Sequence, residues 1–283
     1  MSVMKVIRYI AGGLLLLLFL VHLRYQFLAA DEYAALLARM APDHHIGNPG
    51  LIFWKITLFF LAAFLALHNL TDPLFYRNIE RVSRWDRVVF VLLVLLFLLY
   101  HLGCLLPSIG ALFLEDNLFE SLTAFCAVSA SILLLRGMRR VDTWQARFSL
   151  LAMAGMFFFF GMEEISWGQH IFHWKTPRQW QEINYQHESN LHNLFNPLFP
   201  VLYPLFNLIL ALFFQLAAQL RVRSERFALH RDFMRLLPAA EASFYSLFFS
   251  VLVVQCGVLA GELTEETVAV VGFSYALRQQ TSS

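Results

Sequence analysis

The stretch VVFVLLVLLFLLYHLGCLL, residues 88–106, decides the fold class of this chain. It contains no aspartate, glutamate, lysine or arginine, and most of its side chains are leucine, valine or phenylalanine. A helix that crosses the hydrocarbon core of a bilayer needs about 20 consecutive apolar residues. The stretch therefore predicts a membrane-spanning helix.

Six more apolar runs of comparable length lie on either side of it, at about residues 7–28, 51–70, 118–136, 148–165, 197–220 and 238–260. A shorter apolar stretch, 267–277, would form an eighth helix if that helix began near Glu262. The sequence therefore predicts an all-α, polytopic membrane protein with seven or eight transmembrane helices, folded as one domain over residues 1–283.

The composition excludes several other classes of protein. Hydrophobic residues make up 59% of the 283 residues and charged residues only 14%, whereas soluble domains carry about 25% charged residues. A net charge of +1 gives no strongly basic surface for nucleic acid. The three cysteines lie in apolar stretches, without the spacing of a metal site or a disulfide framework. The composition therefore predicts that the chain is embedded in the lipid bilayer. The sequence does not predict the oligomeric state.

The distribution of arginine predicts the orientation in the membrane. Segments 71–87, 136–147 and 221–235 carry thirteen arginines, and the N-terminal Lys5 and Arg8 fall on the same side. Because cytoplasmic loops are enriched in lysine and arginine, the N-terminus is expected in the cytoplasm, with the chain in the inner (plasma) membrane. The alternate, extracytoplasmic loops would hold most of the acids, including Glu120, Glu262, Glu265 and Glu266.

The longest of these outer loops, 163–196, carries most of the candidate functional residues. It is entered through FFFFGMEEISWGQHIFHW, residues 157–174. If the preceding helix continued past Met162, steps of three and four residues would place one set of side chains on a single face: Glu163, Ser166, Trp167, His170 and His173. Carboxylates and imidazoles in such an array are typical of a zinc or other transition-metal site, and they would also serve as general acids and bases.

A second group of polar residues lies in NYQHESNLHNLFNP, residues 184–197. Glu188 and His192 are four residues apart and would share one face of a helical turn, although the E-x2-H spacing of di-iron bundles is absent. The two groups together give the candidate catalytic residues Glu163, Glu164, His170, Glu188 and His192. The candidate ligands of a divalent metal (zinc, manganese or iron) are Glu163, His170, His173, His187, Glu188 and His192.

The strings EEISWGQ (163–169) and NLHNLF (190–195) resemble those of a family of uncharacterised bacterial multi-pass membrane proteins. The resemblance covers only the part of the chain between residues 163 and 195. It implies a similar polytopic fold and carries no activity, substrate or ligand with it.

Functions from three different classes fit these residues. The leading hypothesis is a membrane-embedded enzyme with an outward-facing Glu/His pocket, which acts on a lipid or lipid-linked substrate by hydrolysis or group transfer. In that enzyme Gln169, Asn190 and Asn193 would bind a polar headgroup. The alternatives are a transporter or channel, although few charges are expected deep in the spans, and a non-catalytic scaffold subunit of a membrane complex. In a simpler interpretation, Glu163 and Glu164 only mark where a span meets water.

Overall fold

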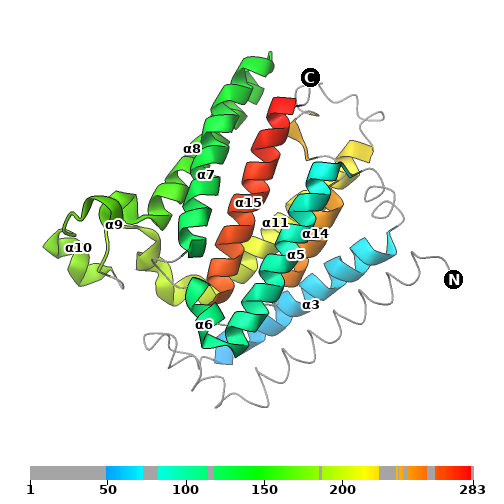
Figure 1. The fold of residues 1–283 in the computed structure, drawn as a ribbon. Helices are drawn as coiled ribbons and strands as arrows, with labels where there is room; N and C mark the ends of the chain where they lie inside the picture. The colour runs from blue at the N-terminus through cyan, green and yellow to red at the C-terminus, as the bar shows by residue number, and fades with distance from the viewer. Residues whose placement is uncertain are drawn as a thin grey trace. The chain divides into compact units, whose positions relative to one another are not determined.

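The computed structural model describes residues 49–72, 82–113, 118–184, 187–222, 234, 236–238, 241–253 and 259–281. Every regular element in these residues is helical, and they contain no strand. The elements are α3 (Pro49–Thr71), α5 (Arg84–Leu105), α6 (Pro107–Gly110), η2 (Ala111–Phe113), α7 (Leu118–Gly137), η3 (Met138–Arg140), α8 (Trp144–Glu164), η4 (Ser166–Gly168), α9 (Gln169–Phe172), α10 (Arg178–Ile183), η5 (His192–Leu198), α11 (Phe199–Val222), α14 (Ala242–Leu252) and α15 (Leu259–Thr281) (Figure 1). The all-α prediction is confirmed.

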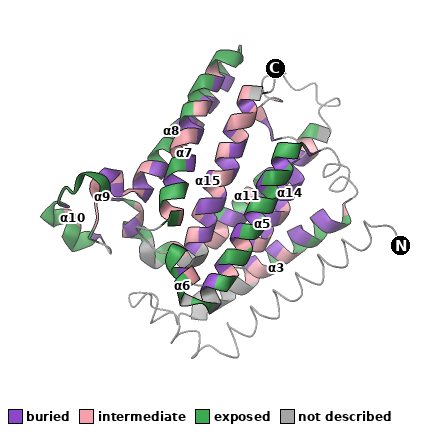
Figure 2. Ribbon diagram, in the orientation of Figure 1, coloured by how far each residue is buried: buried purple, intermediate pink, exposed green. Residues whose placement is uncertain are grey.

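Within the described residues, four helices are long and apolar enough to cross a membrane: Arg84–Gly103 in α5, Leu118–Arg140 around α7, Trp144–Glu164 in α8 and Leu202–Arg221 in α11. Large apolar side chains on them remain exposed, which suits contact with lipid tails. Figure 2 colours many residues of α5 as exposed. The expected span at 7–28 lies outside the described residues. The total of seven or eight spans, and the orientation in the membrane, remain predictions.

The chain forms two compact units, and the first contains α3, α11 and α14. These three helices, among the described residues of the unit, meet at the hydroxyl of Ser246 on α14. That hydroxyl donates a hydrogen bond to the carbonyl oxygen of Ala211 on α11 at 2.9 Å and accepts one from Nδ2 of Asn69 on α3 at 3.0 Å. The rings of Phe214 and Phe249 stack with their centroids 5.7 Å apart. Hydrogen bonds between side chains of neighbouring helices contribute to the association of apolar helices.

The second unit contains α5 to α10 and most of α15. In it α7, α8 and α15 pack through small side chains: Ala127 and Ala130 on α7, Ala154 on α8, and Ala269 and Ala276 on α15. A Cβ added at Gly272 of α15 would lie 2.1 Å from the ring of Phe157 on α8. Small residues allow this close approach of helix backbones.

Helix α15 is much longer than the apolar stretch 267–277 on which the sequence prediction rested. Its described side chains are buried or half-buried along the whole helix, as the purple and pink colours of Figure 2 show. Near its end, Arg278 forms an ion pair with Asp86 in the first turn of α5. A helix rich in polar groups is therefore one of the most enclosed elements, although it is not among the four candidate spans.

Candidate functional site

The helix of the fifth predicted span ends at Glu164, so the condition under which Glu163 to His173 would share one helix face is not met. Ser166, Trp167 and Gly168 have φ angles of 45°, 56° and 85°, which turn the chain out of the helix. Left-handed backbone is uncommon for residues other than glycine. Consecutive residues in this conformation often mark sites where surrounding contacts hold a strained chain.

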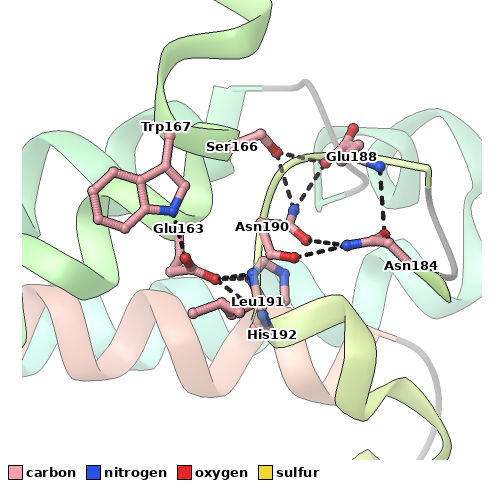
Figure 3. A network of polar contacts seen from close by, with 8 residues as sticks. All are labelled: Glu163, Ser166, Trp167, Asn184, Glu188, Asn190, Leu191 and His192. Atoms are coloured by element: carbon pink, nitrogen blue, oxygen red, sulfur yellow. Dashed lines mark hydrogen bonds and ion pairs between the residues drawn. The ribbon is translucent and has the colours of Figure 1, made fainter. Parts of the chain in front are cut away.

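Glu163, in the last turn of α8, is buried and bound on both carboxylate oxygens (Figure 3). Its Oε1 accepts a hydrogen bond from the indole Nε1 of Trp167 at 2.5 Å. Its Oε2 accepts hydrogen bonds from the backbone N–H of Leu191 at 2.5 Å and of His192 at 3.0 Å. Oε2 also lies 3.7 Å from Nδ1 of His192, within ion-pair range of a protonated imidazole. The carboxylate thus joins the end of α8 to the start of η5.

A second set of contacts surrounds the buried hydroxyl of Ser166 (Figure 3). This hydroxyl donates to Oε2 of Glu188 at 2.5 Å. Nδ2 of Asn190 donates to both of them, at 3.0 Å to the serine and 2.9 Å to the carboxylate. Asn184 holds Asn190 in turn, by bonds from its Nδ2 to the backbone and side-chain oxygens of Asn190 at 2.7 and 3.1 Å.

The loop beyond this centre is tied by Gln169. Its Oε1 accepts hydrogen bonds from the hydroxyl of Thr176 and from the backbone N–H of Ser189, both at 3.0 Å. Gln181 adds a bond from its Nε2 to the carbonyl oxygen of Thr176 at 3.1 Å. The two strings EEISWGQ and NLHNLF are therefore parts of one polar network.

The remaining candidate residues lie away from this centre or on its edge. His173 is exposed, and exposed His187 places Nδ1 2.6 Å from the carbonyl oxygen of Gln181. The side chain of His170 lies outside the described part of the structure. Across the described residues, no three His, Cys, Asp or Glu side chains are grouped so that they could hold a metal ion. The metal set is thus not assembled among the candidate ligands whose side chains are described.

Glu164 faces a different neighbourhood from Glu163. It is 4% exposed, and Glu265, Glu262, Glu120 and Glu266 lie within electrostatic range of it. The sequence predicted these four acids to lie in extracytoplasmic loops. The structure instead places Glu120 and Glu262 in the first turns of α7 and α15, and Glu265 and Glu266 farther along α15, with Glu266 only 5% exposed.

The sequence signals Asn184 as a member of the network, because it precedes Glu188 by one helical step. The sequence does not reveal two other partners that hold the network together, the backbone N–H of Leu191 and the hydroxyl of Thr176. These two contacts depend on how the loop returns to α8, which residue types do not reveal.

Two ionisable side chains of the network keep partial exposure, Glu188 and His192. Each is held from behind by buried groups, Glu188 by Ser166 and Asn190, and His192 by Glu163. This arrangement can present a carboxylate and an imidazole to a bound molecule in fixed positions.

No protein-family model, no curated protein and no solved structure matches this chain. The functional assignment therefore depends on the site itself.

Proposed function

We propose that this chain is a membrane-embedded enzyme that acts on a lipid or lipid-linked substrate by hydrolysis or group transfer. Its site lies where the end of α8 meets the segment 188–193. The observation that carries the proposal is that two partly exposed groups, Glu188 and His192, are each fixed by buried polar partners. Reactive side chains held by a supporting layer of hydrogen bonds are the arrangement that catalysis requires.

His192 serves as a general acid and base. Its side chain is 31% exposed, whereas that of Glu163 behind it is 4% exposed. A buried carboxylate beside an imidazole orients the ring and stabilises its protonated form, as in hydrolytic triads. Glu163 is itself fixed by Trp167 and two backbone N–H groups, so it acts as a positioning residue.

Glu188 serves as the second acid/base group. Its Oε2 is already occupied by Ser166 and Asn190, which hold the carboxylate in one orientation. Ser166 is 0% exposed and therefore positions Glu188 rather than attacking a substrate. Glu188 would take a proton from water or from a substrate hydroxyl, and His192 would protonate the leaving group.

The apolar surroundings suit a lipid. Ile171 and Phe172 of α9 are 60% and 77% exposed, and Leu191 and Phe195, which flank His192, are 40% and 50% exposed. Exposed apolar side chains grouped around polar residues mark sites that bind membranes or apolar ligands. Of the three amides that the sequence suggested for a polar headgroup, Gln169 is half-buried, whereas Asn190 and Asn193 are 2% and 1% exposed.

The test uses the purified full chain reconstituted into vesicles of bacterial polar lipid extract, with lipid products followed by mass spectrometry. Glu188→Gln and His192→Ala should each lower turnover by about 100-fold or more, the usual contribution of a general acid or base. Glu182→Gln and His68→Ala are the matched controls, because both residues are exposed and outside the network. Absence of turnover by the wild type, or full turnover by both site variants, contradicts the proposal.

The same preparations test the predicted divalent metal. One zinc, manganese or iron per wild-type chain, lost in Glu163→Gln and His192→Ala, would support the metal-dependent version. Equal and negligible metal in all three would remove that version and leave the acid/base version standing.

A further inference from the structure

Arginine and tryptophan side chains gather at the end of the second unit where α7 ends and α8 begins. They come from the first turn of α5, the end of α7, η3 and the first turn of α8, and all of them are exposed: Arg84, Trp85, Arg136, Arg139, Trp144 and Arg147. These six residues are called the arginine surface below. We propose that the arginine surface binds the phosphate groups of anionic phospholipids.

Contacts at the C-terminal end of α15 hold these helix ends together. Arg140 of η3 donates a hydrogen bond to the carbonyl oxygen of Gln280, and Nε2 of Gln280 donates to the carbonyl oxygen of Leu133 on α7 at 2.7 Å. Two residues earlier on α15, Arg278 forms an ion pair with Asp86 in the first turn of α5. The start of α5 and the turn between α7 and α8 therefore lie at the same end of the unit, so their arginines contribute to one surface.

The arginines of this surface have donor groups available for a ligand. The side chains of Arg136 and Arg139 make no hydrogen bond or ion pair within the part of the chain that the structure describes. Arg147 donates from its Nε to the carbonyl oxygen of Val141 at 3.1 Å, which holds the side chain at the turn and leaves both Nη groups for a ligand. Guanidinium groups bind phosphate oxygens through paired N–H donors, so this chemistry suits a phosphate.

Acids offset little of this positive charge. The segment 136–147 carries four arginines and one aspartate, Asp142. On α5, the buried Asp86 is already paired with Arg278. The surface therefore keeps a net positive charge, which a negatively charged partner would compensate.

Exposed apolar side chains adjoin the arginine surface, and they favour a lipid as its partner. On α7, Ile132 and Leu135 precede the last arginine of the helix by one turn or less, and both are exposed. On α8, the exposed Phe148 and Leu151 follow the first turn. Trp144 is 71% exposed, and tryptophan is enriched where a membrane meets water. Phosphate groups above acyl chains match this order of arginine, tryptophan and apolar side chains.

The arginine surface and the proposed catalytic site lie at opposite ends of α8. The helix has 21 residues, which at 1.5 Å per residue span about 30 Å, the thickness of the hydrocarbon core of a bilayer. A phospholipid at the arginine surface would therefore lie in the opposite leaflet from a substrate at Glu188 and His192. The proposal does not depend on the proposed enzyme activity.

The experiment titrates fluorescently labelled phospholipids into the full chain, delipidated in a non-ionic detergent, and follows binding by microscale thermophoresis. The wild type should bind phosphatidylglycerol about 30-fold or more tightly than phosphatidylcholine. This preference should fall as salt is added, because salt screens exposed charges. Arg136→Gln/Arg139→Gln should weaken phosphatidylglycerol binding by about 30-fold, the factor that two such charges near a lipid surface contribute, and leave phosphatidylcholine binding unchanged.

The matched control is Lys175→Gln/Arg178→Gln, which removes the same charge from two exposed positions outside the arginine surface and should bind as the wild type does. Size-exclusion profiles should not change, because all four substituted residues are exposed. Arg84→Gln, on a different helix, is an independent variant that should weaken phosphatidylglycerol binding by about fivefold.

Equal binding of the two phospholipids by the wild type overturns the proposal, as do equal losses in Arg136→Gln/Arg139→Gln and in the control. Inorganic phosphate at the same concentration should not displace phosphatidylglycerol. Displacement would show a site for free phosphate and would overturn the proposal. A single-stranded oligonucleotide that binds the wild type more tightly than phosphatidylglycerol would show a nucleic-acid surface, with the same consequence.

Discussion

The carboxylate of Glu163 accepts a hydrogen bond from the backbone N–H of Leu191 at 2.5 Å, across 28 residues of chain. Through this contact the end of an apolar helix fixes the segment that carries His192. The bond is charge-assisted and buried, so it contributes more than an exposed neutral hydrogen bond would.

Glu163→Gln should destabilise the protein by about 2–4 kcal/mol. The glutamine side chain has one acceptor oxygen, so it keeps either the Trp167 contact or the two backbone contacts, and leaves the other side unsatisfied. Thermal unfolding in detergent should show a lower midpoint, with Glu182→Gln as the unchanged control. An unaltered midpoint for Glu163→Gln would mean that these bonds do not hold the loop.

Gly168→Ala should destabilise the turn after α8 by about 1–2 kcal/mol, because its φ of 85° disfavours any side chain. The new Cβ would also lie 3.0 Å from the ring of Phe172. Gly155→Ala is the matched control in the body of α8, where a Cβ meets nothing within 4 Å. It should be neutral or stabilising by up to about 1 kcal/mol. Equal effects of the two substitutions on the unfolding midpoint would contradict the left-handed turn.

Ser246→Ala should destabilise the first unit by about 1–2 kcal/mol. The hydroxyl links Asn69 on α3 to the carbonyl oxygen of Ala211 on α11, and its removal leaves buried polar groups without this partner. Ser149→Ala is the control, because its hydroxyl bonds only within its own helix, to the carbonyl oxygen of Gln145. Unfolding midpoints that fall equally for both variants would show that Ser246 does not join the helices.

Gly272→Ala should disrupt the packing of α15 on α8. The added methyl group would lie 2.1 Å from the ring of Phe157, so the ring or the helix must move. A second substitution, Phe157→Leu, should restore part of the lost stability by making room. Differential scanning calorimetry of the single and double variants checks this. A double variant no more stable than Gly272→Ala alone would contradict the close contact between Gly272 and Phe157.

Long apolar runs made the helices predictable. The stretch 88–106 can be recognised as a helix from its apolar length, which matches the thickness of a bilayer. The structure places this stretch in α5, with Leu106 as the C-cap. The exit from α8 could not be predicted in the same way. Ser166 and Trp167 are not residues that favour left-handed backbone, and they adopt it because distant groups hold the chain there.

The acids of α15 show a second limit. Glu262, Glu265 and Glu266 follow one another closely, and a charge-rich sequence looks the same whether it faces water or a helix interface. The mean hydropathy over this segment is lowered by the charged residues at its start. The apolar stretch that can be recognised in the sequence is therefore shorter than the helix. The helix α15 is buried because alanines and Gly272 permit close packing. This packing depends on α7, α8 and α15 together, so the sequence of α15 alone does not reveal it.

Chemical rescue of His192→Ala tests the central claim most directly. The His192 side chain is 31% exposed, so free imidazole can enter the space that the substitution leaves. Lipid turnover by the reconstituted variant should fall by about 100-fold or more and recover at least tenfold with added imidazole. The control His68→Ala should show neither effect. Turnover by His192→Ala equal to that of the wild type, or a loss that imidazole does not reverse, would contradict the assignment of His192 as the acid/base group.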